Sequence, residues 1–265
     1  MKKNFLIITV LISGFILMNG QYDISLQEDG NKTKGQDKYR SIPNKAFDVG
    51  EKLVFDIDWG VATVGSAEMA IPRILKWNGR EVYEITSRAL SNDLISKIYK
   101  VDDRIVSYID KEGIFSWRLE KNLNEGDWHQ RSLFMLDQDI NLAYSRKDTV
   151  EIPEFCQDVL SAFFYIRTVD LEVGKKIEIP NYDNDKVYYL VVDVLKKQEI
   201  RVPAGKFKCI VVEPKLKTQG LFKHQGRIKI YLTDDDRRIP VLMTSEVKFG
   251  KIQAKLKRIE NTNQR

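Results

Sequence analysis

The chain has 265 residues, of which 43% are hydrophobic and 31% are charged. This much apolar material can fill one large core or two small ones, so a disordered or collagen-like chain is excluded. The formal net charge is +5, and removing Lys2 and Lys3 with a signal peptide leaves +3. A charge this small and this evenly spread does not favour nucleic acid as a partner.

The N-terminal residues 1–20 have the pattern of a secretory signal peptide. Two lysines precede an apolar run from Phe5 to Met18. A helix of that length spans about 20 Å, whereas the hydrocarbon core of a bilayer is about 30 Å thick. We therefore expect cleavage after Gly20, no transmembrane span in the processed chain, and an exported protein of the periplasm or cell surface. An uncleaved N-terminal anchor is the alternative.

Residues 21–45 are polar and show no hydrophobic period, which predicts a flexible leader. Over 46–260 the dominant pattern is an alternation of apolar and polar residues, which places one set of side chains on each face of a strand. The clearest apolar sets are Leu53, Phe55, Ile57 and Trp59; Ala67, Met69 and Ile71; Phe115, Trp117 and Leu119; Ile228, Ile230 and Leu232; and Ile252, Ala254 and Leu256.

Short turn sequences separate these strands at spacings that suit hairpins. They include 77–79, 110–113, 124–126, 203–205 and 234–236. The pattern predicts a single, mainly β domain with up-and-down antiparallel connections. A sheet with one apolar and one polar face is covered on one side or closed on itself. We expect a curved antiparallel sheet that forms a half-barrel or barrel around one central helix.

Two segments have helical spacing instead. Ser91–Tyr99 predicts a short helix, with Asn92 or Asp93 as its cap. Pro153–Val169 predicts the central helix, because its apolar residues cover about 200° of a helical wheel, more than one contact face requires. Arg167 falls inside this apolar arc. A buried guanidinium must be paired or reach solvent along its stem, and Asp56 and Asp58 are equally suitable partners.

Residues for catalysis or metal binding are sparse. His129 and His224 are the chain's two histidines, and neither belongs to a nucleophile or metalloprotease motif. Cys156 and Cys209 either pair or remain as two buried thiols, since neither has metal-ligand spacing. Asp234–Asp236 suits calcium or, more simply, a hairpin turn with a side-chain-to-backbone bond. We expect no enzymatic activity, no cofactor and no metal.

A curved sheet around a helix creates an inner wall that can hold a lipid. The residues expected to line such a cavity are Phe55, Trp59, Phe115, Trp117 and Phe163, with Arg167 meeting a polar head group. The alternative is a core filled by its own side chains, which is the normal state of protein interiors.

Several segments, taken together, resemble a known family. They are Phe47–Leu53, Ile98–Asp103, Asp158–Arg167, Gly205–Cys209 and Asp235–Val241, within a match from about Phe47 to Lys257. The sequence is similar to exported bacterial proteins of unknown function, the DUF3108-like family. The resemblance implies a Gram-negative envelope address and an antiparallel β architecture, and it transfers no catalytic residue. The order of strands, helix and strands is also similar to half-barrel carriers that shield lipoprotein acyl chains.

The leading hypothesis is an exported cell-envelope protein that binds an apolar or amphiphilic component, such as a lipid or envelope glycolipid, in the concave face of its sheet. The alternative is a non-catalytic module that docks to an envelope protein through a strand edge. A hydrolase is the third possibility, for which the residues that activate a nucleophile are missing.

Overall fold

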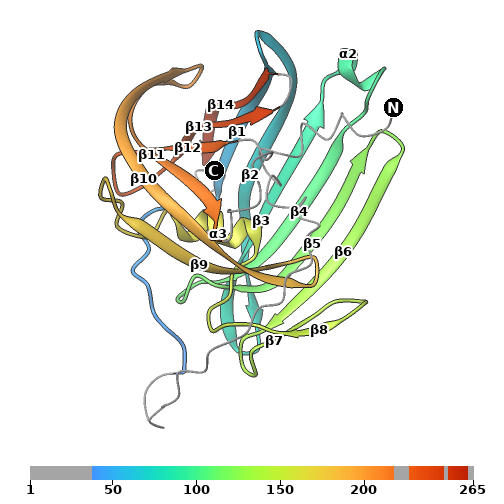
Figure 1. The fold of residues 1–265 in the computed structure, drawn as a ribbon, viewed down its shortest axis with the longest axis vertical. Coiled ribbons are helices and arrows are strands. Elements are labelled where there is room, and N and C mark those ends of the chain that lie inside the picture. The colour runs from blue at the N-terminus through green and yellow to red at the C-terminus, as the bar shows by residue number, and fades with distance from the viewer. Residues whose placement is uncertain (1–37, 218–226, 248–249, 262–265) are drawn as a thin grey trace.

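The computed structural model describes residues 38–217, 227–247 and 250–261. The predicted signal peptide and residues 21–37 of the predicted leader lie outside these ranges. The described chain forms one open, curved sheet of fourteen strands in the order β8-β7-β6-β5-β4-β3-β2-β1-β14-β13-β12-β11-β10-β9, with antiparallel neighbours (Figure 1). The predicted mainly β, antiparallel architecture is therefore confirmed, and the sheet is not closed.

The fourteen strands account for most of the described residues. They are β1 (Glu51–Trp59), β2 (Ala62–Trp77), β3 (Arg80–Ser91), β4 (Asp102–Asp110), β5 (Ser116–Glu125), β6 (Trp128–Asp137), β7 (Leu142–Tyr144), β8 (Thr149–Glu151), β9 (Lys176–Asp183), β10 (Lys186–Val202), β11 (Gly205–Leu216), β12 (Ile228–Thr233), β13 (Pro240–Val247) and β14 (Gly250–Asn261).

The sheet consists of two meanders that meet at the pair formed by β1 and β14. One meander runs from β1 to β8 and the other from β9 to β14, so the chain must pass from one edge of the sheet to the other between β8 and β9. The helix α3 (Val159–Tyr165) lies on this passage, within the curve of the sheet (Figure 1). The connectivity thus explains why a helix occurs inside a β domain.

The central helix predicted over Pro153–Val169 is not confirmed, because α3 has only seven residues. Asp158 is its N-cap and accepts hydrogen bonds from the first-turn amides, which fixes its start. Before the cap, Phe155 has a positive φ of 54° and Gln157 forms a parallel bridge to Asn181 of β9. Neither conformation can continue a helix backwards. The wide apolar arc of the sequence therefore reflects burial of a short helix and its extended flanks.

The core has two main clusters that meet at α3. The first lies under β1, β2 and β10–β14, and the second under β3–β7. Ala162 of α3 belongs to the first, while Leu160 and Phe164 belong to the second. The alternating residues of β14, Ile252, Ala254 and Leu256, are fully buried in the first cluster, as their pattern predicts.

Residues 38–45, which the sequence assigns to the flexible leader, pack against the domain. The ring of Tyr39 stacks on Phe115 with 5.7 Å between centroids. Arg40 donates to the carbonyl of Gly113 at 2.7 Å, and the amide of Ile42 donates to the carbonyl of Glu112 at 2.8 Å. This part of the predicted leader therefore contributes contacts to the fold.

The second helix, α2 (Asp93–Ser96), lies within the predicted segment Ser91–Tyr99. Asn92 is its N-cap and accepts from the amide of Ile95 at 3.0 Å, so one of the two expected caps is confirmed. In the described ranges, no helix has both the length and the apolar composition needed to cross a bilayer.

Candidate functional site

The six residues predicted to line one cavity lie in different parts of the core. Phe55 is fully buried in the first cluster, against which Trp59 and Phe163 also pack. Phe115 and Trp117 are fully buried in a third, small cluster with Val82. Three of the predicted residues therefore lie in or against the large first cluster, and the aromatic pair on β5 lies in another cluster.

Arg167, the sixth predicted residue, forms a buried ion pair, and its partner differs from both candidates. Its Nη1 lies 2.7 Å from Oε1 of Glu51, with the arginine 1% and the glutamate 6% exposed. Asp56 and Asp58 instead pair with Lys257 and Lys255 of the neighbouring β14. Asp56 and Asp58 are the wrong partners because they alternate with the buried residues of β1 and so lie on the opposite face of the strand. Glu51, the first residue of β1, is buried.

Three of the segments that carry the family resemblance meet at this ion pair. Arg167 belongs to one, Glu51 to the second, and Arg237 to the third. The guanidinium of Arg167 also donates to the carbonyls of Ala46 (3.0 Å) and Arg237 (3.2 Å), and the Arg237 side chain reaches Glu51 at 3.1 Å. The ring centroids of Phe47 and Phe164 lie about 5 Å from the guanidinium carbon of Arg167. The guanidinium is therefore enclosed by protein groups, and its contacts stabilise the fold.

The two cysteines remain as thiols, and the aspartate cluster forms a turn. Cys156 and Cys209 are both free and buried, and burial raises the pKa of the Cys209 thiol to about 11. Asp235 accepts from the hydroxyl of Thr233 and from the amides of Arg237 and Arg238. Residues 234–236 therefore form the predicted hairpin turn, and the described residues contain no group of three metal-ligating side chains.

A buried carboxyl pair lies near the start of β4 and the end of β5. Glu125 is 2% exposed, and the Tyr99 hydroxyl lies 3.4 Å from its Oε2. Asp103 is also buried and accepts from the amide of Asn124 at 2.8 Å. Burial, followed by the negative charge of Asp103, raises the pKa of Glu125 to about 8. The folded protein therefore holds a proton here at neutral pH.

This proton predicts a pH-dependent stability. The unfolded chain releases it near pH 4.5 and the folded chain near pH 8, so the free energy of unfolding should fall as pH rises between these values. The slope from one proton is at most about 1.4 kcal/mol per pH unit. Urea denaturation at pH 5, 6, 7 and 8 should show this decline in the wild type and a flatter profile in Glu125→Gln. Equal slopes in both proteins would contradict the assignment.

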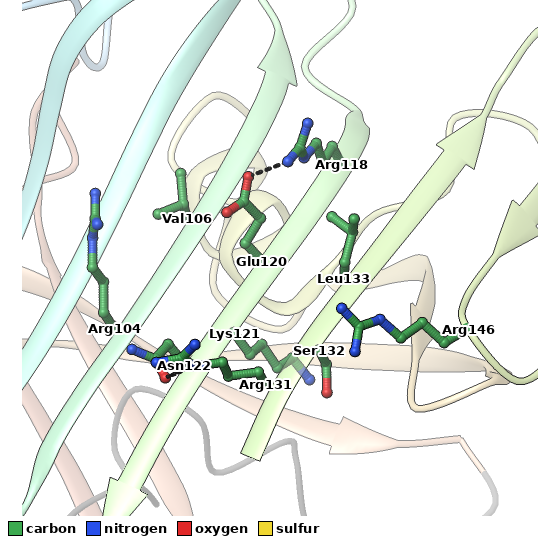
Figure 2. Close-up of a pocket in the computed structure, with 10 residues that line it drawn as sticks. All are labelled: Arg104, Val106, Arg118, Glu120, Lys121, Asn122, Arg131, Ser132, Leu133 and Arg146. Carbon is green, nitrogen blue, oxygen red and sulfur yellow. Dashed lines mark hydrogen bonds and ion pairs between the residues drawn. The ribbon is translucent and has the colours of Figure 1, made fainter. Parts of the chain in front are cut away.

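A groove of about 290 Å³ lies on the outer face of β4, β5 and β6 (Figure 2). Most of its lining side chains alternate along each strand with core residues such as Ile105, Leu119 and Phe134, so they point away from the core. Lys121 and Ser132 are the exceptions, since they share the strand face of these core residues and border the groove from below. The ten lining residues are Arg104, Val106, Arg118, Glu120, Lys121, Asn122, Arg131, Ser132, Leu133 and Arg146.

Strand register builds the groove in two rows. Arg104, Asn122 and Arg131 are direct cross-strand neighbours on β4, β5 and β6. Val106, Glu120 and Leu133 form the next row along the same strands. The segment between β7 and β8 adds Arg146, whose guanidinium extends toward Ser132 in Figure 2. A polar, cationic row therefore lies beside a row with two apolar side chains.

Positive charge dominates the groove. Glu120, its one carboxylate, is paired with Arg118 at 2.7 Å, and the buried amine of Lys121 is bonded to Asp183. Arg131 makes one weak contact, to Oδ1 of Asn122 at 3.3 Å. Within the described ranges, Arg104, Arg131 and Arg146 have no carboxylate partner. Exposed guanidinium groups that no carboxylate neutralises can bind an external anion through paired, charge-assisted hydrogen bonds.

Sequence reasoning does not identify this groove. Arg104, Arg118 and Arg131 occupy polar positions of alternating strands, where arginine is an ordinary solvent-facing residue. The signal that joins them is the register of two strand pairs, β4 with β5 and β5 with β6, which a single strand pattern does not contain. Arg146 lies outside the strands and has no periodic signal.

Comparison with known proteins places the chain in a family but not in a functional class. No curated protein matches the sequence. A crystal structure of a β-barrel-like DUF1849 protein from Brucella abortus superposes with a TM-score of 0.52 and 12% identity, covering 84% of this chain and 99% of the other. This likeness supports the barrel-like fold alone.

Two further solved structures match at lower scores. One is a Bacteroides fragilis protein described as a candidate exported protein with a YmcC-like fold (TM-score 0.31, 12% identity, 84% and 99% coverage). The other is a candidate lipoprotein from Parabacteroides distasonis (0.32, 11%, 85% and 100%). Residues 54–257 match the family model described as protein of unknown function, DUF3108. Since this match spans most of the chain, the protein belongs to the DUF3108 family.

Proposed function

We propose that this protein is a non-catalytic, exported component of the cell envelope that binds the anionic group of an amphiphilic molecule in the groove on β4–β6. The single observation that carries the proposal is the set of arginines in one groove with one, already paired, carboxylate. Export is supported by the signal-peptide pattern of residues 1–20.

The spacing of the arginines suits a phosphate or carboxylate group. Neighbouring strands lie about 4.8 Å apart, so Arg104 on β4 and Arg131 on β6 start about 10 Å from each other. Their side chains can therefore approach an anion above β5 from opposite sides, and the amide of Asn122 lies between them. A guanidinium donates two parallel hydrogen bonds to such an anion, which gives direction as well as attraction.

Leu133 explains why an amphiphile is proposed and not a free anion. It is 37% exposed and lies one row along from Arg131, whereas Val106, across the same row beyond Glu120, is 6% exposed. An acyl chain or other apolar part of the ligand can cover Leu133. The proposal keeps the amphiphilic ligand that the sequence favours. It places the charged group of that ligand on the outer face of the sheet and not in the predicted inner cavity, because the predicted cavity residues pack into separate clusters.

Glu120 has the one carboxylate among the ten lining residues, and its pairing with Arg118 leaves it poorly suited to act as a general base. This supports a binding role over hydrolysis. The anion could belong to a lipid head group or to a free phosphate, and the two are separated by the ligands chosen for the test.

The test is a calorimetric titration with soluble short-chain phospholipids. Dihexanoyl phosphatidic acid should bind, and dihexanoyl phosphatidylcholine and inorganic phosphate should bind more weakly. The double variant Arg104→Gln with Arg131→Gln should weaken binding of the phosphatidic acid at least about tenfold, since it removes two charged donors. Binding should also weaken as salt is added.

Arg201→Gln is the matched control. Arg201 is an exposed arginine on β10 and does not line the groove, so its removal changes the net charge by the same step as the single variant Arg131→Gln without touching the site. It should bind phosphatidic acid like the wild type. Equal weakening in Arg201→Gln and in Arg131→Gln would show non-specific attraction, and inorganic phosphate binding as tightly as the lipid would remove the amphiphile from the proposal.

A further inference from the structure

Exposed apolar side chains gather at the end of the sheet where β1 joins β2, β3 joins β4, and β5 joins β6. In the antiparallel order these three connections share one end, and α2 lies at this end in Figure 1. Val61 is fully exposed, Leu94 and Ile98 are 69% and 80% exposed, and Trp128 is 42% exposed. We call these four residues the apolar tip.

Hydrogen bonds hold the three connections of the apolar tip together. The side chain of Asn92, the cap of α2, donates to the carbonyl of Thr63 at 2.7 Å, beside the turn between β1 and β2. On the other side, the amide of Gly126 donates to the carbonyl of Lys100 at 2.8 Å. Trp128 follows two residues after Gly126. The apolar side chains therefore project from a braced end of the sheet.

Three exposed lysines flank the apolar tip. Lys97 and Lys100 flank Ile98 and are exposed. Lys251 is exposed as well, and its carbonyl accepts from the amide of Gly60 at 3.1 Å, next to Val61. Asp93 and Asp127 carry the opposing charge, so these five residues have a net charge of +1.

We propose that the apolar tip docks on a lipid bilayer, with its four apolar side chains at the boundary of head groups and acyl chains. Leucine, isoleucine and tryptophan beside lysines are the composition that binds this boundary, and anionic head groups attract the lysines. A protein partner fits less well, because an interface needs a broad, closely packed surface and these side chains project singly from three separate connections.

The docking brings the arginine groove near the membrane surface. Arg104 is two residues from the start of β4 and Arg131 is three residues from the start of β6, which places both about 7 to 10 Å from the tip end. This is the depth of the head-group region. The inference does not depend on the groove binding a ligand, and the two can fail separately.

The experiment is flotation of the protein, purified in its processed form from the cells that make it, with vesicles on a density gradient. Wild type should float with vesicles of phosphatidylcholine and phosphatidylglycerol at a 3:1 ratio. The variant Leu94→Gln with Ile98→Gln should lower the partition coefficient at least about tenfold, because two apolar side chains that enter the bilayer on docking are lost. Circular dichroism would verify that the variant folds. Folding should be retained, because the two side chains are exposed and contribute little to the core.

Ile140→Gln is the matched control for the single variant Ile98→Gln, because Ile140 is 57% exposed and follows β6 at the opposite end of the sheet. It should float like the wild type. On pure phosphatidylcholine vesicles the wild type should float more weakly, and Arg104→Gln with Arg131→Gln should float as the wild type does there, which separates the tip from the groove. The proposal is overturned if wild type does not float, if the tip variant floats like the wild type, or if Ile140→Gln loses as much.

Discussion

Replacing Arg167 with leucine should lower the free energy of unfolding by about 3 to 5 kcal/mol, the cost of breaking a buried ion pair. The loss arises mainly at Glu51, which is 6% exposed and would remain as a charge without its main partner. Arg237 also reaches Glu51 at 3.1 Å, but its side chain is half exposed and cannot fill the space of the buried guanidinium.

Two further variants separate charge from geometry at this site. Arg167→Lys keeps a positive charge but cannot donate at once to Glu51 and to the carbonyls of Ala46 and Arg237, so it should fall between leucine and wild type. Glu51→Gln leaves the guanidinium buried beside a neutral amide and should be destabilising as well. Because both partners anchor the same contact, combining Arg167→Leu with Glu51→Gln should cost less than the sum of the single losses.

Urea denaturation followed by tryptophan fluorescence measures these changes. Arg88→Gln is the control, because Arg88 pairs with Asp102 on the surface, with side chains 46% and 35% exposed. Such pairs contribute about 0 to 1 kcal/mol. If Arg167→Leu costs no more than Arg88→Gln, the buried ion pair does not stabilise the fold.

The Arg167 site shows what a sequence can and cannot specify. The apolar arc leaves two outcomes for this arginine, pairing or reaching solvent along its stem, and the structure shows it buried and paired. The partner lies 116 residues away, and its identity depends on how β1 is aligned within the sheet. Asp56 and Asp58 are on the same strand as Glu51, but they face β14 lysines on the outer side. The alternation along β1 already places Asp56 and Asp58 on the outer face and Glu51 in phase with the buried Leu53. What the pattern does not contain is which end of the strand lies near the helix.

The same limit applies to the helix and to the groove. Alternation along β1 and β14 predicts their buried faces correctly, because each signal is local. The length of α3 is set by Asp158 and by the bridge from Gln157 to β9, which are tertiary contacts invisible to a helical wheel. The groove on β4–β6 depends on two strand registers at once. Local chemistry therefore predicts the elements, and the pairing of elements creates the site.

Replacing Asp158 with alanine should destabilise the protein by about 3 kcal/mol or more, from a lost cap and buried donors left without an acceptor. One carboxylate oxygen accepts from the amides of Leu160 and Ser161, at 2.7 and 2.9 Å. The other accepts from the hydroxyls of Ser107 on β4 and Ser116 on β5. The side chain thus fastens the start of α3 to two strands.

Asp158→Asn tests which part of this arrangement matters. The asparagine keeps one oxygen for the two amides, and its NH₂ group can donate to the serine hydroxyls, which also accept. It should therefore cost less than alanine. Burial raises the pKa of Asp158, so the carboxyl gains little from its charge, and a neutral replacement of the same shape is a close substitute.

Asn92→Ala is the matched control, since Asn92 caps the four-residue helix α2, which has no buried residues. Its loss should cost about 1 kcal/mol, well below that of Asp158→Ala in urea denaturation. Hydrogen exchange adds a local readout, because the amides of Leu160 and Ser161 should lose protection in Asp158→Ala and keep it in Asn92→Ala. Full protection of both amides in Asp158→Ala would show that α3 is held by its apolar contacts and not by its cap.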